Sequence, residues 1–544
     1  MPGGMMGKLA TPSDIGPGMD RRRFLQAIGA AGLAAGFAAS VSACGGPQST
    51  RDSEGGGGVD KDGTIEAGIS YALSTGFDPM IASSAAVLAA NLHVFEGLVD
   101  LDPVTREPYP ALAAKLPEKV DDTTWRVTLR EGATWHDGSK VTADDVVFSF
   151  TRIIAPDSTS LMKQFLPFLA GVTKIDDKTA EFKLKYPFAL FPERVSVTKI
   201  VPKAVVEANS QAFDSLPTGS GPYKIVEATK DDKMVFERHD AYNGPRPALA
   251  KKMNWRFLTD PAARATAIES ARVHAIEDVP YLDVDRLAKT ASVESVQSFG
   301  LLFMMFNCKQ KPFDDKRVRQ ALFYATDLNK IISTALLGNA APATSFVQEG
   351  HPGYRRAKTV YTYDPAKAKT LLAAAGASNL AVTLVTTDTG WVKDCAPLIK
   401  ESWDAIGVST TLDIGQSGGQ YKEKIDTGRF QVMVAPGDPS VFGNDVDLLL
   451  RWWFVGTWMD TRHRWAGTPE ATKVSALLDQ AAREADADKQ RALWGEAYDL
   501  ISEEAPLYPL LHRKLPTAWN PKTLKDFKPL PTTGLSFLGV SRTS

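Results

Sequence analysis

Apolar and polar residues alternate from Trp125 to Arg130, in the most informative stretch of the chain. This period of two predicts a strand with one buried and one solvated face. Glu131-Gly132 ends the strand. Asp137-Gly138 then predicts a turn, because glycine tolerates positive φ and aspartate can bond its own backbone two residues on.

A capped helix is predicted to begin after Thr142, whose hydroxyl can accept from the backbone amide three residues on. Asp145 places a carboxylate near the positive end of that helix. Val146, Phe150 and Ile153 follow at positions i, i+4 and i+7, so they form one apolar face. The stretch therefore predicts a strand, a turn and a capped helix in that order.

Similar patterns recur along the rest of the chain. They predict strands at 64–72, 291–300, 381–387, 408–414 and 430–434, and helices at 82–99, 364–376, 395–406, 474–485 and 491–503. In the second half, strands and helices alternate. This alternation favours βα units and a largely parallel sheet.

Composition places the chain among globular proteins. It has 544 residues, of which 44% are hydrophobic and 23% charged, a length that suggests roughly three to four domain-sized units. The formal net charge of -2 gives no electrostatic reason to expect nucleic acid binding. The seven histidines are scattered without an HExxH or Cys-x-x-Cys motif, so no cofactor or metal is predicted, although a nickel site assembled on folding stays open.

The first residues predict export. Arg21 to Leu25 reads Arg-Arg-Arg-Phe-Leu and precedes a short run of small apolar residues, which resembles a twin-arginine signal and is poorly suited to a permanent membrane span. Val41-Ser42-Ala43-Cys44 resembles a bacterial lipobox, in which Cys44 is diacylated. We expect an export signal at 1–44, a flexible linker at 45–63, and anchoring of the mature protein to the outer face of the cytoplasmic membrane.

Three segments together resemble one protein family. The first is 125–150, where a strand ending in Leu-Arg is followed by Gly, Trp, Asp-Gly and Thr-Ala-Asp-Asp-Val. The second is the Gly-rich segment 217–225, and the third runs from Phe306-Asn307 to Leu322. This order is similar to that of the family 5 extracellular solute-binding proteins, the peptide and nickel receptors of ABC importers. The resemblance extends from about Thr64 to the C-terminus.

The resemblance implies an α/β fold of the two-lobed periplasmic-binding-protein type (type II), with an inserted α+β domain. The implied boundaries are lobe I at 64–85, 209–296 and 510–544, the inserted domain at 86–208, and lobe II at 297–509. It also implies a monomeric receptor rather than an enzyme. Such a receptor closes on a peptide or another small solute and docks on a permease with a separate ATPase subunit, which agrees with the absence of a GxxxxGK[ST] string here.

Candidate ligand-binding residues follow from the same resemblance. Ser74 and Thr75 lie in the loop after the first strand, which borders the ligand cleft in the family, and Asn307 belongs to the third matching segment. The family places an acid that binds the ligand's ammonium group in the loop after strand 430–434. Asp438 is the acid available there, and a turn-forming aspartate beside proline is the alternative interpretation.

An aromatic cluster surrounds Trp452 and Trp453. Most tryptophan clusters belong to a core, so we expect one of these two rings at the cleft and the rest inside. The segment 388–393 lacks the arginine that some dipeptide-binding members use for the ligand's carboxylate. This difference weakens a strict dipeptide assignment and leaves longer peptides, a nickel complex, an opine or a saccharide open.

Two further features keep alternatives open. Residues 415–419 fit the GxSxG motif, with Ser417 as nucleophile, and Asp438 and His463 or His512 follow in the order of a serine hydrolase, so a secreted hydrolase is the competing function. Cys308 and Cys395 can form a disulfide outside the cytoplasm or stay as buried thiols.

Overall fold

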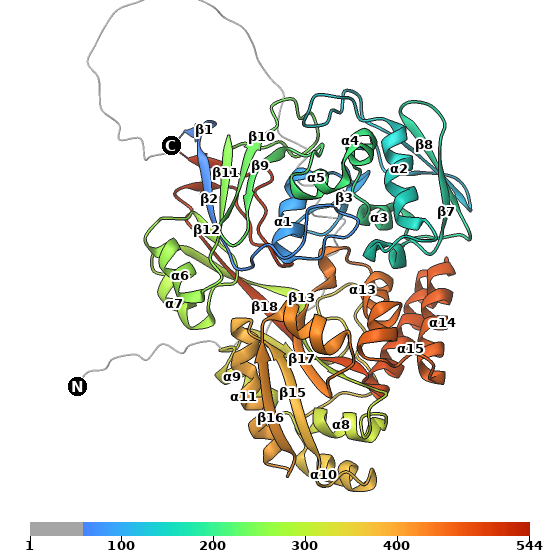
Figure 1. Ribbon diagram of the computed structural model, residues 1–544, viewed down its shortest axis with the longest axis vertical. Helices are drawn as coiled ribbons and strands as arrows, with labels where there is room; N and C mark the ends of the chain where they lie inside the picture. Colours follow the sequence, from blue (N-terminus) through green and yellow to red (C-terminus); the bar gives the residue numbers. More distant parts are fainter. Residues whose placement is uncertain (1–57, 544) are drawn as a thin grey trace, which may run out of the picture. The chain divides into compact units, whose positions relative to one another are not determined.

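A computed structural model describes residues 58–543 of the chain. The predicted export signal, Cys44 and most of the predicted linker lie outside these residues. The largest sheet has 11 strands (Figure 1). They are β2 (Thr64–Ile69), β9 (Tyr223–Thr229), β10 (Lys233–Arg238), β11 (Lys252–Phe257), β12 (Ala275–Ile276), β13 (Ser292–Phe306), β14 (Ala340–Pro342), β15 (Ala381–Thr387), β16 (Ser409–Gly415), β17 (Val432–Gly437) and β18 (Leu507–Trp519).

The strand order of this sheet is β16-β15-β17-β13-β18-β12-β2-β11-β10-β9, with β14 paired to β18. β15 is parallel to β16 and β17, and β2 is parallel to β11 and β12. The other pairs are antiparallel, including β13 with both β17 and β18. The parallel arrangement predicted from the βα units of the second half is confirmed for β15, β16 and β17, but the sheet as a whole is mixed. β13 and β18 run in opposite directions through the middle of the sheet, and this divides it into two short parallel groups.

β13 and β18 join the two halves of the sheet (Figure 1). The first half consists of β12, β2, β11, β10 and β9, and the second half of β17, β15 and β16. Their pairing extends from Ser292 opposite Trp519 to Met305 opposite Leu507, with irregularities near Gln297. The last nine residues of β13 are all buried, which fits a central strand covered on both faces. The crossing strand predicted at 291–300 is thus real and continues to Phe306.

A separate four-stranded sheet contains the strand predicted at the start of the segment 125–150. It consists of β5 (Glu118–Asp121), β6 (Thr124–Thr128), β7 (Leu169–Lys174) and β8 (Thr179–Leu184), in the order β5-β6-β8-β7. Gly138 has a φ of 86° in the turn that precedes α2 (Ala143–Ile154). The backbone N–H and the hydroxyl of Thr142 both donate to Asp145 Oδ2, at 2.9 and 3.0 Å. The predicted strand, turn and capped helix are confirmed.

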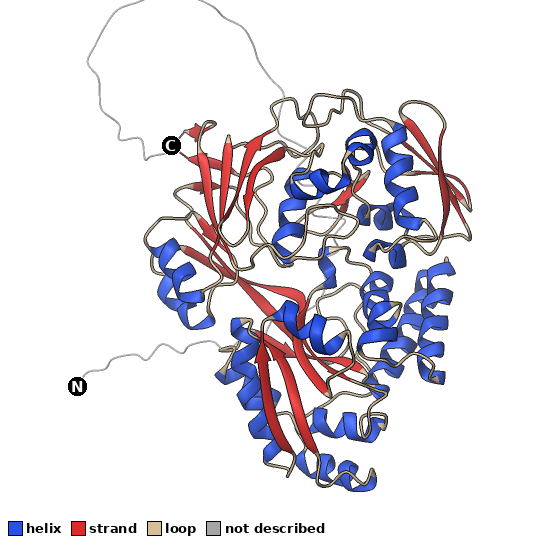
Figure 2. Ribbon diagram, in the orientation of Figure 1, coloured by secondary structure: helices blue, strands red, loops and turns tan. Residues whose placement is uncertain are grey.

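Helices flank the strands in both halves (Figure 2). The first half has α1 (Ala85–Val94), α3 (Phe191–Arg194), α4 (Lys203–Ala208), α5 (Ser210–Ser215), α6 (Pro261–Glu269) and α7 (Val284–Leu287). The second half has α8 (Lys316–Tyr324), α9 (Leu328–Thr334), α10 (Pro365–Ala374), α11 (Gly390–Asp404), α12 (Ser417–Gln420), α13 (Val446–Phe454), α14 (Pro469–Arg483) and α15 (Ala487–Glu504). Short strands complete the fold, namely β1 (Val59–Asp60), β3 (Val99–Leu101), β4 (Pro108–Pro110), β19 (Leu524–Lys525) and β20 (Ser541–Thr543).

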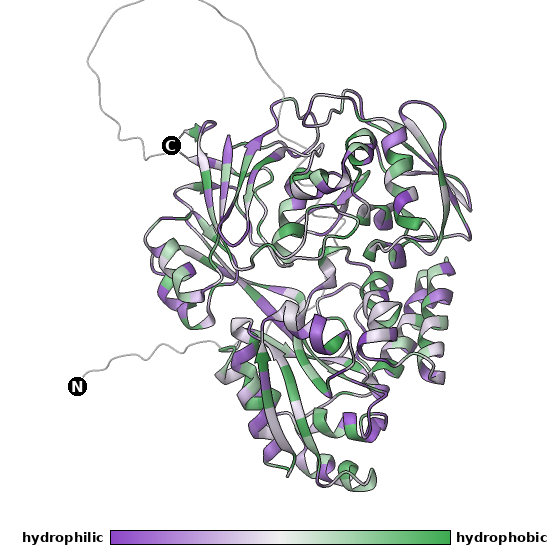
Figure 3. Cartoon of the chain, in the orientation of Figure 1, coloured by the Kyte–Doolittle hydropathy of each residue, from purple (hydrophilic) through white to green (hydrophobic). Residues whose placement is uncertain are grey.

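Two large apolar cores lie beneath these elements. One packs β2, α1 and β9 to β11 against the C-terminal segment, and it includes Tyr223 and Phe537. The other is continuous from the four-stranded sheet into the second half, and it includes Phe182, Leu302 and Trp453. The buried strand β15 is apolar along most of its length (Figure 3). Residues 98–200 therefore contribute to a core that continues into the second half, whereas α1 belongs to the other core. The predicted domain boundaries themselves stay a prediction.

Candidate ligand cavity

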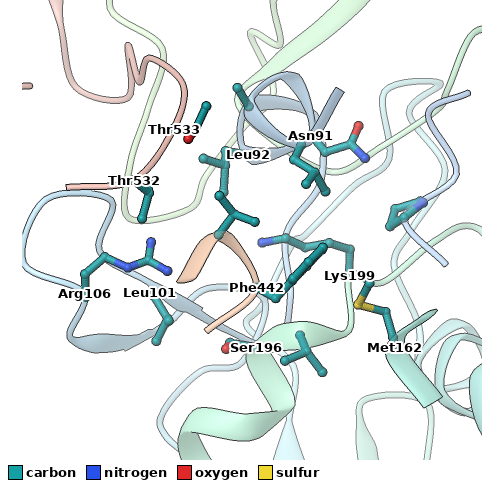
Figure 4. Close-up of a pocket in the computed structure, with 15 residues that line it drawn as sticks. Asn91, Leu92, Leu101, Arg106, Met162, Ser196, Lys199, Phe442, Thr532 and Thr533 are labelled. Atoms are coloured by element: carbon teal, nitrogen blue, oxygen red, sulfur yellow. The ribbon is translucent and has the colours of Figure 1, made fainter. Parts of the chain in front are cut away.

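Four parts of the chain that are distant in sequence surround a cavity of about 70 Å³ (Figure 4). They are α1 with Pro79 before it, the region from Leu101 to Lys199, the loop at Val441 and Phe442, and the C-terminal Thr532 and Thr533. This volume holds on the order of five water molecules. Binding sites for drug-sized molecules usually have about 300–1,000 Å³, so these parts must move apart to admit a molecule of that size.

Arg106 points its guanidinium toward this cavity from the turn between β3 and β4 (Figure 4). Its Nη2 donates to the carbonyl of Ser440 at 2.5 Å, and its Nε is buried without a partner among residues 58–543. Burial lowers the pKa of Arg106 to about 10, against the opposing effects of the carboxylates of Asp438 and Asp102. The guanidinium is therefore a partly uncompensated cation.

Lys199 is the second cation at the cavity, and its Nζ extends into it (Figure 4). This Nζ donates to Asp100 Oδ1 at 2.5 Å, and both side chains are mostly buried. Lys199 is thus neutralised by its own partner, whereas Arg106 takes part in no ion pair within the described residues.

Asp438 lies next to the cavity lining, at the start of the turn η5 (Pro439–Val441). Its Oδ1 accepts from the backbone N–H of Ser440 at 3.2 Å, and its Oδ2 accepts from the N–H of Thr533 at 3.1 Å and from the Thr533 hydroxyl at 3.3 Å. Burial raises the pKa of Asp438, and these hydrogen bonds oppose that effect. The carboxylate therefore connects the loop to the C-terminal segment.

Trp452 and Trp453 have different surroundings, although they are adjacent on α13. Trp453 is 1% exposed and packs against Trp458 with ring centroids 4.3 Å apart. Trp452 is only partly buried, and its ring lies 5.0 Å from Phe442, which lines the cavity. Trp452 is thus the member of the pair on the cavity side.

The other predicted ligand-binding residues lie in two places. Ser74 is exposed, and the buried Thr75 hydroxyl has no partner within the described chain, while Pro79 of the same loop lines the cavity. Asn307 is 3% exposed, and its amide donates to the carbonyls of Gly428 and Phe430 at 3.0 and 3.2 Å. It holds the end of β13 in place and is not part of the cavity lining.

Sequence reasoning missed Arg106, Lys199, Phe442 and Thr533. They are separated by up to several hundred residues, and no local pattern connects them. The structure adds one signal for Arg106, because the turn Asp-Pro-Val-Thr-Arg ends on this residue with a φ of 64°, a conformation that favours glycine or asparagine. A large cationic side chain at such a position indicates a constraint beyond the turn itself.

The geometry does not assemble the hydrolase triad. Ser417 follows β16 and begins α12, as the GxSxG pattern predicts. Within residues 58–543, however, no hydrogen bond joins Ser417 to His463, His512 or Asp438. His463 is instead bonded to the Trp453 carbonyl at 2.8 Å, and burial lowers its pKa to about 4.

Cys308 and Cys395 are buried free thiols, and burial raises their pKa values to about 11 and about 12. Within the described residues, no three or more His, Cys, Asp or Glu side chains are grouped so that they could hold a metal ion. The helices of the same residues include none with the length and apolar character that crossing a membrane requires.

Comparison with known proteins agrees with this architecture. The glutathione-binding protein GsiB of Salmonella typhimurium strain LT2 is 27% identical over 487 residues, which cover 88% of this chain and 94% of that protein. A dipeptide-binding protein from Pseudoalteromonas sp. SM9913, in complex with Met-Leu, superposes with a TM-score of 0.80 at 20% identity, covering 89% of this chain and 100% of that one.

A third similar protein is the binding protein AgaA of A. tumefaciens R10, in complex with agropinic acid. Its TM-score is 0.79 at 25% identity, covering 89% of this chain and 99% of that one. The profile of the bacterial extracellular solute-binding proteins, family 5 (middle), matches residues 107–460. This match spans well over half of the chain, which therefore belongs to the family 5 bacterial extracellular solute-binding proteins.

Proposed function

We propose that the protein is a lipid-anchored receptor that captures peptides between its two halves and delivers them to an ABC importer. The observation that carries this proposal is the cavity, which is enclosed by segments from both halves and contains unpaired polar groups. The names of two similar proteins support peptides as the solute, since one binds glutathione and the other was solved with Met-Leu.

In this mechanism the two halves separate and close about β13 and β18, which join them. A solute that contacts both halves binds the closed state more tightly than the open state, so it shifts the population toward closure. The closed receptor then docks on the permease, and a separate ATPase subunit supplies the energy. Anchoring through Cys44, outside the described residues, keeps the receptor close to that permease.

We assign the ammonium group of the peptide to Asp438, and contacts along the peptide to Ser74, Thr75 and Trp452. Thr533 occupies Oδ2 of Asp438 in the present conformation, so separation of the halves would release this acceptor. Asp438→Asn should then weaken binding of peptides with a free amine and leave N-acetylated peptides unaffected. Titration calorimetry tests this, and equal affinity of the wild type for both peptide forms would contradict the role of Asp438.

An opine is the second candidate solute, because AgaA, a similar protein at 25% identity, was solved with agropinic acid. Native mass spectrometry of the purified receptor separates the two candidates by the mass of any co-purified ligand. A thermal-shift screen with glutathione, other short peptides and agropinic acid then ranks them. A ligand at a hundred times its Kd adds about 2.7 kcal/mol of stability. Stabilisation by agropinic acid alone would refute the peptide proposal.

A further inference from the structure

We propose that the cavity binds a carboxylate of the solute and that Arg106 is the residue that selects anionic solutes. This inference rests on the proposed receptor function and narrows its substrate class to peptides, or similar solutes, that place a carboxylate next to Arg106.

The first argument is the hydrogen bonding of the guanidinium. A guanidinium has five N–H donors. The contact with Ser440 uses Nη2, and Nε is buried with no acceptor in the described residues. Buried donors of native proteins are nearly always paired. A carboxylate is the group that matches the planar donor arrangement of arginine, because it can accept two N–H bonds at once.

The second argument is charge. The acidic side chains near Arg106 are already engaged, since Asp438 accepts from Ser440 and Thr533, and Asp102 forms an ion pair with Arg246. Lys199 is paired with Asp100. Within residues 58–543, Arg106 is therefore the cation at this cavity that lacks an ion-pair partner, which agrees with the fall of its pKa to about 10 on burial.

The third argument is preorganisation. The turn that carries Arg106 is held by Asp102, whose Oδ1 accepts from the backbone N–H groups of Val104 and Thr105 at 2.8 and 2.7 Å. The N–H of Arg106 donates to the Asp102 carbonyl at 2.9 Å. These bonds hold the backbone of Arg106 in its left-handed conformation. A guanidinium that extends from a fixed backbone loses less freedom when it binds a carboxylate than one on a mobile loop.

The walls of the cavity suit the carbon atoms next to a carboxylate. Leu92, Leu101 and Met162 supply apolar surface near the two cationic groups (Figure 4), and Val441 also lines the cavity. Apolar walls exclude water, and a charge-assisted hydrogen bond is stronger in such surroundings than at the surface. The site thus distinguishes a carboxylate from a carboxamide of the same shape.

The test compares matched probes on the purified receptor. The probes are Ala-Glu-Ala and Ala-Gln-Ala, each as free acid and as C-terminal amide, together with reduced glutathione and succinate. We expect the wild type to bind at least one carboxylate form on the order of 10- to 100-fold more tightly than its amide counterpart. Arg106→Gln should abolish this preference, and Arg106→Lys should restore part of it, since lysine keeps the charge without the planar donors.

Arg126→Gln is the control, because Arg126 pairs with Glu181 at the surface and does not line the cavity. It should keep the preference for carboxylates. The melting temperature of ligand-free Arg106→Gln should stay within about 2 °C of the wild type. A variant that unfolds or melts much lower would make Arg106 a structural residue and overturn the inference.

The remaining outcomes separate the two proposals. If peptides bind but acid and amide forms bind equally, or Arg106→Gln keeps the preference, the receptor function stands and the role of Arg106 is overturned. If succinate binds in an Arg106-dependent way and no peptide binds, the carboxylate site stands and the peptide proposal is overturned. Absence of binding by every probe overturns both.

Discussion

Arg194 and Arg106 both belong to the first half and contact the segment 440–447 of the second half, but their guanidinium groups differ in how fully they are hydrogen-bonded. Arg194 is 1% exposed and donates to Asp445, to Asp447 Oδ2 at 3.0 Å and to the Phe165 carbonyl at 3.0 Å. Arg106 donates to one carbonyl and leaves Nε unpaired within the described chain.

The pKa values of these arginines shift in opposite directions. Burial alone would lower the pKa of Arg194, but Asp445 and Asp447 together raise it above its ordinary value. At Arg106 burial dominates, and the pKa falls. A buried cation with a partner at each of its nitrogens fixes the position of two segments, whereas one with an unpaired nitrogen is available to a ligand. The comparison separates a structural contact from a binding group of the same residue type.

The largest expected effect concerns Arg194. Arg194→Met leaves Asp445 and Asp447 buried with one cation fewer, and breaking a buried pair in this way costs about 3–5 kcal/mol. Urea unfolding measures the loss. Arg126→Met is the control, because its pair with Glu181 is largely exposed on the arginine side and contributes about 0–1 kcal/mol. Equal effects of both variants would show that Arg194 is no more structural than a surface arginine.

Asp447 makes the same contact sensitive to acid. Burial would raise its pKa, but Arg451 and Arg194 hold it below the ordinary 3.8. Its contribution to stability is therefore complete above pH 3.8 and is lost as the pH falls through the lower folded-state pKa. Asp447→Asn should lower stability at pH 7 by about 1.5–3 kcal/mol and flatten the dependence of the melting temperature on pH below 4. An unchanged acid profile would place the sensitivity elsewhere.

Phe442 raises the same question for an apolar side chain, namely whether it serves packing, solute binding or both. Its ring lies 5.0 Å from Trp452 and 5.9 Å from Phe165, so it packs between the two halves while lining the cavity. Phe442→Leu should cost about 1 kcal/mol in urea unfolding, because the side chain is only partly buried. It should also weaken solute binding. A loss of stability with unchanged affinity would make Phe442 a packing residue alone.

The smallest effect on stability is expected at Arg106. Arg106→Gln removes a cation without an ion-pair partner, so the free energy of unfolding should stay within about 0.5 kcal/mol of the wild type. The direct test is to measure the unfolding free energies of Arg106→Gln and Arg194→Met in the same urea titration. A loss as large as that of Arg194→Met would remove the distinction between the two arginines.

Local sequence patterns predicted those strands and helices whose apolar residues recur with the period of the element. The strand expected at 381–387 is β15, and the helix expected after Thr142 is α2. Helix ends were less predictable: the helix expected at 82–99 covers only Ala85–Val94. The motif resemblance supplied the family, because it depends on many fixed positions and not on long-range geometry.

The cavity could not be predicted in the same way. Arg106, Phe442 and Thr533 meet only because the chain crosses between the halves twice, and no periodicity in the sequence encodes that meeting. Trp452 and Trp453 show the same limit on a smaller scale. Neighbouring positions on a helix face directions about 100° apart, so composition marks both rings and only the packing decides which one is at the cavity.

The place of β18 in the sheet also determines when the protein can finish folding. β18 lies between β13 and β12, yet it is the last strand of this sheet along the chain, so the other strands are synthesised before it. Until then β13 and β12 each present an unpaired strand edge, and such edges promote aggregation. A chain interrupted before residue 507 is left with two half-sheets and nothing to join them. Addition of β18 is therefore the step that lets the two half-sheets join.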